Sequence, residues 1–325
     1  MNFCTLFDSN YLTRGLAMYE SLKAHCSNFH LYIFPFDDIC YEILSKLDLE
    51  DVTLVSLKEF EDEKLLSIKS DRTRGEYCWT ATSSTIFYVL TKFGLDHCTY
   101  LDADLYFYSS PEILLDEARD KSILITDHRY SDQYNRAYDC GKYCVQFVYF
   151  KNNQNGMNAL KWWRDECIKW CYNRQEDGKF GDQKYLDDWP SRFNEVHELE
   201  HLGGGVAPWN VQQYNIIRGE ENITIIDKKS QKSYPLVFYH FHELKFIERD
   251  IKVLLCGYEL RKDVIETLYL PYIHHLLAIK KSLQMLDKNI NPQEYPLIKR
   301  DFTYYLRTVK RFFIPVPNMI RIKNG

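Results

Sequence analysis

The sequence lacks the features that mark membrane-spanning and secreted proteins. No run of residues approaches the roughly 18 apolar residues of a spanning helix. The opening residues, Met1-Asn2-Phe3-Cys4, do not form a basic region followed by a long apolar one, so we expect no secretory signal. The 10 cysteines include no C-x-x-C pair, and the pairs Cys140/Cys144 and Cys167/Cys171 are interpreted as reduced thiols rather than zinc ligands. These absences predict a cytoplasmic protein.

Other absences exclude two functional classes. With a net charge of −5, the chain lacks the positive field of a general nucleic-acid binder. No G-x-G-x-x-G opens the first predicted helix, so the fingerprint of a dinucleotide-binding protein is missing. What the sequence does contain is 45% hydrophobic residues, enough for a large core, and 15% aromatic residues. Aromatic side chains suit an enzyme that packs sugar or base rings, although an ordinary core also uses them.

Strands and helices alternate along the first part of the chain. Short apolar runs predict strands, and apolar residues at helical spacing predict the helices between them. This order indicates a mostly parallel α/β sheet with crossover helices on its faces. The predicted strands cover 2–7, 29–34, 52–54, 98–101, 122–126, 143–150, 222–226 and 235–239; the predicted helices cover 11–26, 39–47, 72–93, 155–172 and 261–286, with another beginning at 58–64.

Two aspartates end the central predicted strand. Asp102 and Asp104 follow the apolar run 98–101 at once, and the apolar run then resumes at Leu105. Residues two apart in extended chain point to the same side, so both carboxylates face one space. A D-x-D pair arises by chance in surface loops, but burying two carboxylates without a cation would cost several kcal/mol each. The apolar context therefore favours a divalent cation site.

A third ligand is expected from the last predicted strand. His240 ends that strand, and parallel strands end at one edge of a sheet, where ligands collect. Two carboxylates and one imidazole favour Mn²⁺, with Mg²⁺ as the alternative. A histidine in an aromatic strand is usually structural, and His242 is the rival ligand two residues on. Between these sites lies the glycine-rich segment 201–210, which indicates either close backbone approach to a ligand or a flexible connection.

Three motifs together resemble the family 8 retaining glycosyltransferases and their bacterial relatives. They are Asp102-Ala103-Asp104, Gly181-Asp182-Gln183, and His240-Phe241 followed by Lys245; the opening run F-C-T-L-F-D-S-N-Y-L-x-R-G-L is also similar. The resemblance implies the GT-A fold, a Rossmann-like, mostly parallel sheet flanked by helices. It covers about residues 1–250, the expected nucleotide-sugar-binding catalytic domain. Residues 251–325 are then a helical extension that is basic at its end.

The resemblance also implies roles for matching residues. Asp102, Asp104 and His240 would hold the metal on the diphosphate of a nucleotide-sugar donor. One position departs from the family: Glu243 stands where a glycine is usual, which leaves both the metal-binding histidine and the role of Lys245 open. The remaining implied residues are Phe7, Asp8, Asn10, Arg74, Trp79, Ala103 and Asp104 for donor binding, Asp182 and Gln183 at the transferred sugar, and Lys245 at the leaving group.

The predicted function is metal-dependent transfer of a hexose from a UDP-linked donor to a glycan or lipid-linked acceptor, in bacterial lipopolysaccharide or capsule synthesis. Retention of configuration is what the resemblance implies. Two alternatives stand beside it. A non-catalytic, cation-dependent sugar-binding module would use the same aromatics and cation. An Asp-based phosphatase would place a threonine soon after the aspartates, and here Leu105 and Tyr106 follow.

The end of the chain has a different charge from the rest. From Lys299 onward there are seven basic residues and one acid, Asp301, with aromatic residues interleaved. Such a segment indicates docking to an anionic lipid surface or a helix packed on the domain with a solvated basic face. The first interpretation predicts a cytoplasmic protein held peripherally on the inner face of the cell membrane.

Overall fold

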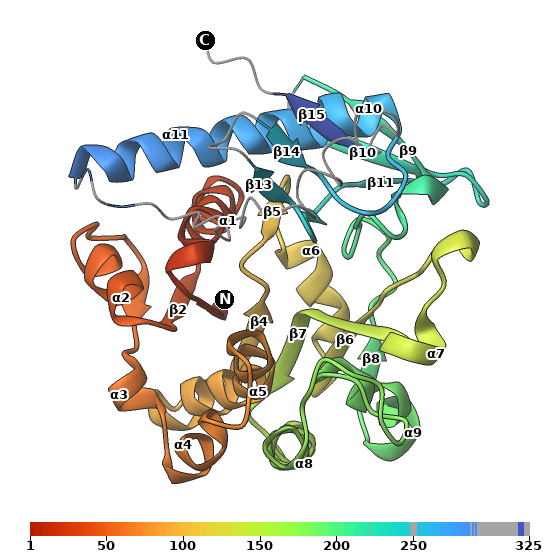
Figure 1. Cartoon of the computed structure of the whole chain (residues 1–325). Coiled ribbons are helices and arrows are strands. Elements are labelled where there is room, and N and C mark those ends of the chain that lie inside the picture. The colour runs from red at the N-terminus through yellow and green to blue at the C-terminus, as the bar shows by residue number, and fades with distance from the viewer. Residues whose placement is uncertain (221, 248–251, 287, 289, 291–317, 322–325) are drawn as a thin grey trace, which may run out of the picture.

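The computed structural model describes residues 1–220, 222–247, 252–286, 288, 290 and 318–321 (Figure 1). Its centre is a seven-stranded sheet in the order β3-β2-β1-β4-β7-β6-β8. Only β7 runs antiparallel to its neighbours in this sheet, which confirms the predicted mostly parallel α/β fold. The strands are β1 (Asn2–Phe7), β2 (His30–Pro35), β3 (Val52–Leu54), β4 (His97–Leu101), β6 (Ile123–Asp127), β7 (Tyr143–Lys151) and β8 (Val196–Glu198).

Helices cover both faces of this sheet, so its strands carry apolar residues on both sides. In β1, Phe3 and Phe7 join one buried cluster, while Cys4 and Leu6 join the cluster on the opposite face. The first face is covered by α1 (Leu12–His25), α2 (Asp38–Ser45) and α11 (Leu270–Leu286), the second by α3 (Leu57–Phe60), α4 (Glu63–Lys69), α5 (Arg74–Lys92) and α8 (Gln154–Lys169). Short helices α6 (Glu112–Leu115), α7 (Ala137–Cys140) and α9 (Trp189–Arg192) lie in the connections.

The sequence-based prediction of His240 on a strand of the parallel sheet is wrong. The predicted strand 235–239 is split: β11 (Ser233–Pro235) joins β9 (Tyr214–Arg218) and β10 (Ile223–Asp227) in a separate sheet. His240 belongs to β12 (Phe238–His240), which pairs antiparallel with β5 (Leu105–Phe107). In this register His240 lies opposite Leu105, the residue after Asp104. The histidine thus reaches the aspartates by strand pairing, not by sharing a sheet edge with them.

The glycine-rich segment packs closely against other parts of the chain, which differs from the flexible connection that its composition also allowed. An added Cβ at Gly203 would lie 1.9 Å from the carbonyl oxygen of Pro235. Gly205 has φ +85° and lies close to the side chain of Thr126. The segment runs beside β12, where Val206 bridges Tyr239. These glycines allow two backbones to approach closely, and this contact fixes the position of β12.

The helical C-terminal segment is present. α10 (Lys262–Val264) passes through a π-helical turn, Ile265–Tyr269, into α11. The π turn lies just before Pro271, which has no N–H to donate within a helix. Buried residues of α11 belong to the same apolar cluster as α1, so one core spans both sides of the predicted boundary at residue 250.

A small sheet that the sequence did not predict joins this part of the chain. It contains β13 (Lys245–Ile247), β14 (Lys252–Leu254) and β15 (Met319–Arg321). Most of the basic aromatic segment that begins at Lys299 lies outside the described residues. Among the residues that are described, no helix is both long and apolar enough to cross a bilayer.

Candidate active site

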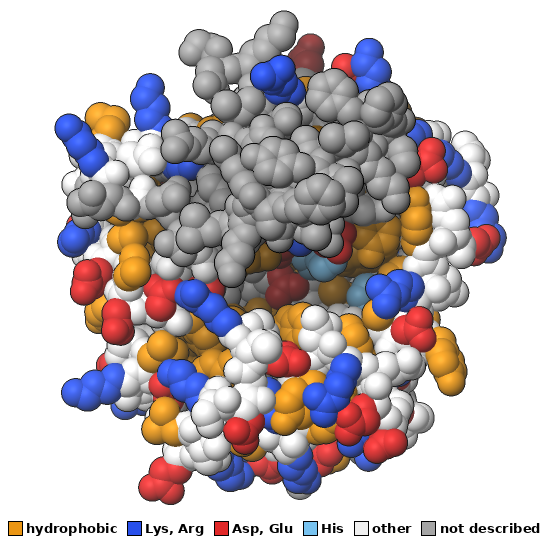
Figure 2. All heavy atoms as spheres, viewed as in Figure 1, with side chains coloured by type: hydrophobic (Ala, Val, Ile, Leu, Met, Phe, Trp, Pro, Cys, Tyr) orange, Lys and Arg blue, Asp and Glu red, His pale blue; other side chains and the backbone are white. Residues whose placement is uncertain are grey.

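A cavity of about 670 Å³ opens beside the carboxyl ends of β1 and β4. Its volume is in the usual range for a small-molecule site. Acidic and histidine side chains are visible inside the hollow in Figure 2. The predicted residues that line it are Phe7, Asp8, Asn10, Arg74, Trp79, Asp102, Ala103, Asp104, Asp182, Gln183, His240 and His242. Lys245 is the exception: it is exposed on β13 and is not part of the lining.

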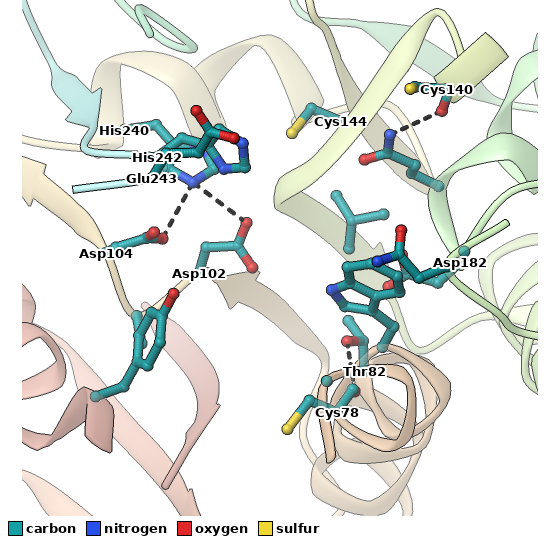
Figure 3. Close-up of a pocket in the computed structure, with 18 of the residues that line it drawn as sticks. Cys78, Thr82, Asp102, Asp104, Cys140, Cys144, Asp182, His240, His242 and Glu243 are labelled. Atoms are coloured by element: carbon teal, nitrogen blue, oxygen red, sulfur yellow. Dashed lines mark hydrogen bonds and ion pairs between the residues drawn. The ribbon is translucent and has the colours of Figure 1, made fainter. Parts of the chain in front are cut away.

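The two aspartates and His240 converge in this cavity (Figure 3). The Nε2 atom of His240 lies 3.0 Å from Oδ1 of Asp104 and 3.9 Å from Oδ2 of Asp102. Asp102 is held by its backbone N–H, which donates to the carbonyl oxygen of Gln146 on β7. Asp104 is held by its carbonyl oxygen, which accepts from the N–H of Phe241. Both ends of the cluster are therefore fixed by backbone hydrogen bonds.

Gln146 determines which nitrogen of His240 faces the carboxylates. Oε1 of Gln146 lies 2.8 Å from Nδ1 of His240, so Nδ1–H donates to Gln146 and Nε2 faces the carboxylates, where it donates to Asp104 when protonated and can bind a metal when it is not. Trp209 packs edge-on against the same ring, with 5.3 Å between centroids. The sequence analysis missed Gln146. Its signal was a single amide in the otherwise apolar run 143–150.

The charges of the cluster are strongly coupled. Burial raises the pKa of Asp102 to about 6, with a further contribution from the negative charge of Asp104. Burial also acts to raise the pKa of Asp104, but the charge of His240 and its hydrogen bond hold that pKa at about 2. Burial opposes protonation of His240, yet Asp104 raises the pKa of the imidazole well above its ordinary value. The cluster thus favours positive charge between its carboxylates, and a divalent cation would supply that charge.

His242 and Glu243 follow on the same wall. The ring of His242 lies 5.7 Å from that of His240 and also packs against Trp209. Glu243 has φ +63°, in the left-handed region that favours glycine. The position where the resembling family has glycine thus retains a backbone conformation suited to glycine. The Glu243 carboxylate accepts from the N–H of Gly257, which compensates in part for the strain.

The end of the cavity near β1 is built around an arginine with two acidic partners. Asp8 accepts from the backbone N–H groups of Asn10 and Tyr11. Nε of Arg74 lies 2.5 Å from Oδ2 of Asp8, and the same guanidinium pairs with Asp37. Asp37 was not predicted as a site residue. It caps α2 by accepting from the N–H of Cys40, and so ties Arg74 to that helix.

Asp182 and Gln183 line the cavity beside α5, where an added Cβ at the preceding Gly181 would lie 3.4 Å from the ring of Trp79. Asp182 stands at the N-cap position of the 3₁₀-helix Gln183–Asp188, without a capping hydrogen bond from its side chain. Burial raises the pKa of Asp182 to about 8, and the negative charge of Asp102 contributes in the same direction. The amide N–H of Gln183 donates to the carbonyl oxygen of Cys140, which fixes the side chain. Without a cation beside Asp102, the raised pKa favours the neutral carboxyl group of Asp182, which can donate a hydrogen bond.

An aromatic wall that the sequence analysis missed completes the cavity. It consists of His128, Tyr130, Trp209 and Tyr258. The rings of His128 and Tyr130 stack at 4.5 Å and 11°, and burial lowers the pKa of His128 to about 3. Flat aromatic faces beside polar groups are suited to binding a sugar ring. The signal in the sequence was the polar, aromatic loop 128–136, which carries no recognisable motif.

No family model matches the chain. A search of curated proteins finds YfnD of Bacillus subtilis (strain 168), described as uncharacterized, which is 33% identical over 282 residues, covering 85% of this chain and 88% of YfnD. The chain belongs to the same protein family as YfnD. YfnF of the same organism, also described as uncharacterized, is 28% identical over 300 residues, covering 89% of this chain and 96% of YfnF.

The solved structures identify the fold. The galactosyltransferase LgtC, in complex with donor and acceptor sugar analogues, superposes with a TM-score of 0.52 at 11% identity, covering 86% of this chain and 96% of LgtC. An active-site mutant of LgtC gives a TM-score of 0.50 at 12% identity. The chain therefore has the GT-A glycosyltransferase fold. At this identity the likeness establishes the fold alone.

Proposed function

We propose that this protein is a metal-dependent glycosyltransferase of the family 8 type, which moves a hexose from a UDP-linked donor to a glycan or lipid-linked acceptor. The observation that carries the proposal is the convergence of Asp102, Asp104 and Nε2 of His240 in the cavity of a GT-A fold. Two carboxylates and an imidazole fit Mn²⁺, and Mg²⁺ is the second choice. When bound, the cation would neutralise the charge of the departing diphosphate.

The nucleobase is assigned to the end of the cavity near β1. Phe7 offers apolar surface there and Asn10 offers an amide; the ring of Trp79, which also packs against Gly181, adds aromatic surface to the cavity. Arg74 holds Asp8 through an ion pair, so the Asp8 carboxylate keeps one orientation. These groups suit a flat heterocycle with hydrogen-bonding edges, which supports a uridine nucleotide.

The transferred sugar is assigned to the space between Asp102 and Asp182. In a retaining transfer, the bond from the anomeric carbon to the phosphate oxygen breaks, the acceptor hydroxyl attacks the same face, and its proton passes to the departing phosphate. No anionic nucleophile from the protein is needed. The raised pKa of Asp182 fits this, because a neutral acid donates a hydrogen bond to a sugar hydroxyl but attacks poorly. Gln183 lies next to it, and the role of Lys245 at the diphosphate stays a prediction.

Gln146→Leu is expected to weaken Mn²⁺ binding by about 10–100-fold, because it removes the acceptor that orients His240. The amide nitrogen of Gln146 is buried and has no hydrogen-bond partner, so an apolar side chain of similar size is not expected to unfold the protein. Titration of Mn²⁺, followed through the paramagnetic resonance signal of the free ion, measures the change.

Gln154→Leu serves as the matched control, because Gln154 is exposed at the start of α8, away from the cavity. Its Mn²⁺ affinity is expected to equal that of the wild type. Equal affinity in the wild type and in Gln146→Leu would contradict the orienting role of Gln146.

Stability is expected to fall with rising pH because of Asp182. The folded state keeps the proton of this carboxyl up to about pH 8, whereas the unfolded chain loses it near pH 3.8. Between these values the folded state binds more protons, so the contribution of Asp182 decreases by up to about 1.4 kcal/mol per pH unit. Asp182→Asn removes this contribution. Urea unfolding of the wild type and of Asp182→Asn is measured from pH 5 to 8 in the presence of a chelator. The difference between their free energies of unfolding is expected to change with pH; a constant difference would refute the raised pKa of Asp182.

Binding and turnover distinguish the proposed enzyme from the sugar-binding alternative. UDP-glucose, UDP-galactose and their N-acetyl forms are screened for thermal stabilisation in Mn²⁺ and in chelator. One of them is expected to stabilise the protein only with Mn²⁺ and to be hydrolysed slowly to UDP. Stabilisation with no UDP released, even with oligosaccharide acceptors, would favour the binding module. The GT-A fold gives no support to the phosphatase alternative.

The acceptor is assigned to the aromatic wall, and the setting to bacterial surface polysaccharide synthesis. The wall offers stacked rings that line the cavity. The setting rests on the family resemblance and on the basic composition of the chain after Lys299. Sedimentation with anionic and neutral vesicles tests the proposed peripheral attachment to the membrane: binding to both or to neither would count against it.

A further inference from the structure

The sulfur of Cys144 lies beside the proposed cation site. Cys144 stands on β7 two residues before Gln146, so both side chains face the same side of the sheet. One ligand atom each of Asp102, Cys144 and His240 can be chosen so that all three lie within 4.8 Å of one another. Figure 3 shows the sulfur turned toward His240. Three different donor atoms, one oxygen, one sulfur and one nitrogen, therefore surround one point.

This donor set differs in kind from the one proposed for Mn²⁺. A thiolate is a soft ligand that favours Zn²⁺ over Mn²⁺ or Mg²⁺. Three protein ligands with a fourth position open to water or substrate are the usual arrangement of a catalytic zinc site. Asp102 and His240 are common to both donor sets. Asp104 belongs only to the set proposed for Mn²⁺, and Cys144 belongs only to the second set.

The surroundings of the sulfur favour a dry, fixed site. Cys144 is buried and packs in a small apolar cluster with Ala207 and Trp209. Trp209 also packs against His240, and its indole N–H donates to the carbonyl oxygen of His128. A ligand set held in this way loses little conformational freedom when a metal binds.

We propose that Asp102, Cys144 and His240 form a second, softer metal site that binds Zn²⁺ and overlaps the site for Mn²⁺. On binding, the cysteine thiol loses its proton to solvent and the sulfur bonds the metal. Because two ligands are shared, Zn²⁺ excludes Mn²⁺ and stops any reaction that needs it. The inference shares residues with the proposed function but does not depend on sugar transfer.

Co²⁺ binding to the whole chain tests the sulfur ligand directly, because a cobalt–thiolate bond gives intense near-ultraviolet absorption. The wild type is expected to show this absorption with Co²⁺ alone and to lose it when Zn²⁺ is added. Cys144→Ser is expected to lose it and to bind Zn²⁺ at least tenfold more weakly. Cys140→Ser is the matched control, because Cys140 also lines the cavity but lies outside the donor set; it should retain the absorption.

The proposal would be overturned if the wild type bound Co²⁺ without the cobalt–thiolate absorption, or if this absorption were unchanged in Cys144→Ser. The wild-type spectrum decides the matter even if the serine variant does not fold. A separate titration follows free Mn²⁺ by paramagnetic resonance: Zn²⁺ should release bound Mn²⁺ in equal amount, and simultaneous binding of both ions would also overturn it. If the cobalt–thiolate absorption appears but no UDP-sugar is hydrolysed, only the transferase proposal fails.

Discussion

Asp102→Asn is expected to reduce sugar transfer by at least about a thousandfold while the protein remains folded. The substitution removes a charged ligand from the cation that would face the departing diphosphate, and electrostatic stabilisation of this kind is commonly the largest catalytic contribution. Asparagine keeps the size of the side chain, so the cavity retains its shape. Release of UDP from the donor in saturating Mn²⁺, with and without acceptor, measures the loss.

Stability measurements separate this effect from unfolding. Burial raises the pKa of Asp102 to about 6, so the folded state disfavours its charged form at pH 7. Replacing the carboxylate by an amide is therefore expected to leave the free energy of unfolding equal to or above that of the wild type. Asp116→Asn, at an exposed position on a short 3₁₀-helix, is the matched control and should transfer sugar normally. Wild-type transfer by Asp102→Asn would contradict the metal assignment.

Most of the central sheet could be predicted because its inner strands are buried on both faces, whereas the half-buried, three-residue edge strand β8 was missed. Such strands appear as continuous apolar runs, and β1, β2, β3, β4, β6 and β7 all lie within one residue of the predicted bounds. Asp102 and Asp104 stood out for the same reason, as charges at the end of an apolar run. The pairing of β5 with β12 could not be predicted, because each strand has three residues and the two lie about 130 residues apart in sequence. No local pattern identifies such a partner.

The missed residues acquire their roles only through tertiary contacts. Gln146 is one amide in an apolar strand until β12 brings His240 against it. Asp37 looks like an ordinary helix cap, which it also is, until Arg74 from α5 reaches it. Cys144 was interpreted through its spacing to Cys140, whereas the fold brings its sulfur within 4.8 Å of ligand atoms of Asp102 and His240. Motif matching selected the residues that match the resembling family, and the structure shows which neighbours contact them.

Gly203→Ala is expected to destabilise the protein by about 2–3 kcal/mol or more, which is typical of a forced backbone shift in a packed interior. A methyl group there would lie 1.9 Å from the carbonyl oxygen of Pro235, and a backbone carbonyl cannot turn away as a flexible side chain can. The carbonyl oxygen of Gly203 also accepts from the N–H groups of Val237 and Phe238, at the start of β12. Urea unfolding at pH 7 measures the change.

The same variant connects the fold to the site, because any shift of the glycine segment moves the strand that carries His240. Mn²⁺ affinity is therefore expected to fall together with stability. Gly75→Ala is the matched control for stability: Gly75 lies in the first turn of α5 with no atom within 4 Å of an added Cβ, so alanine should be neutral or stabilise by about 0.5–1 kcal/mol. If Gly203→Ala were as stable as Gly75→Ala, the close contact between the glycine segment and Pro235 would be refuted, and the segment would be the flexible connection that its composition also allowed.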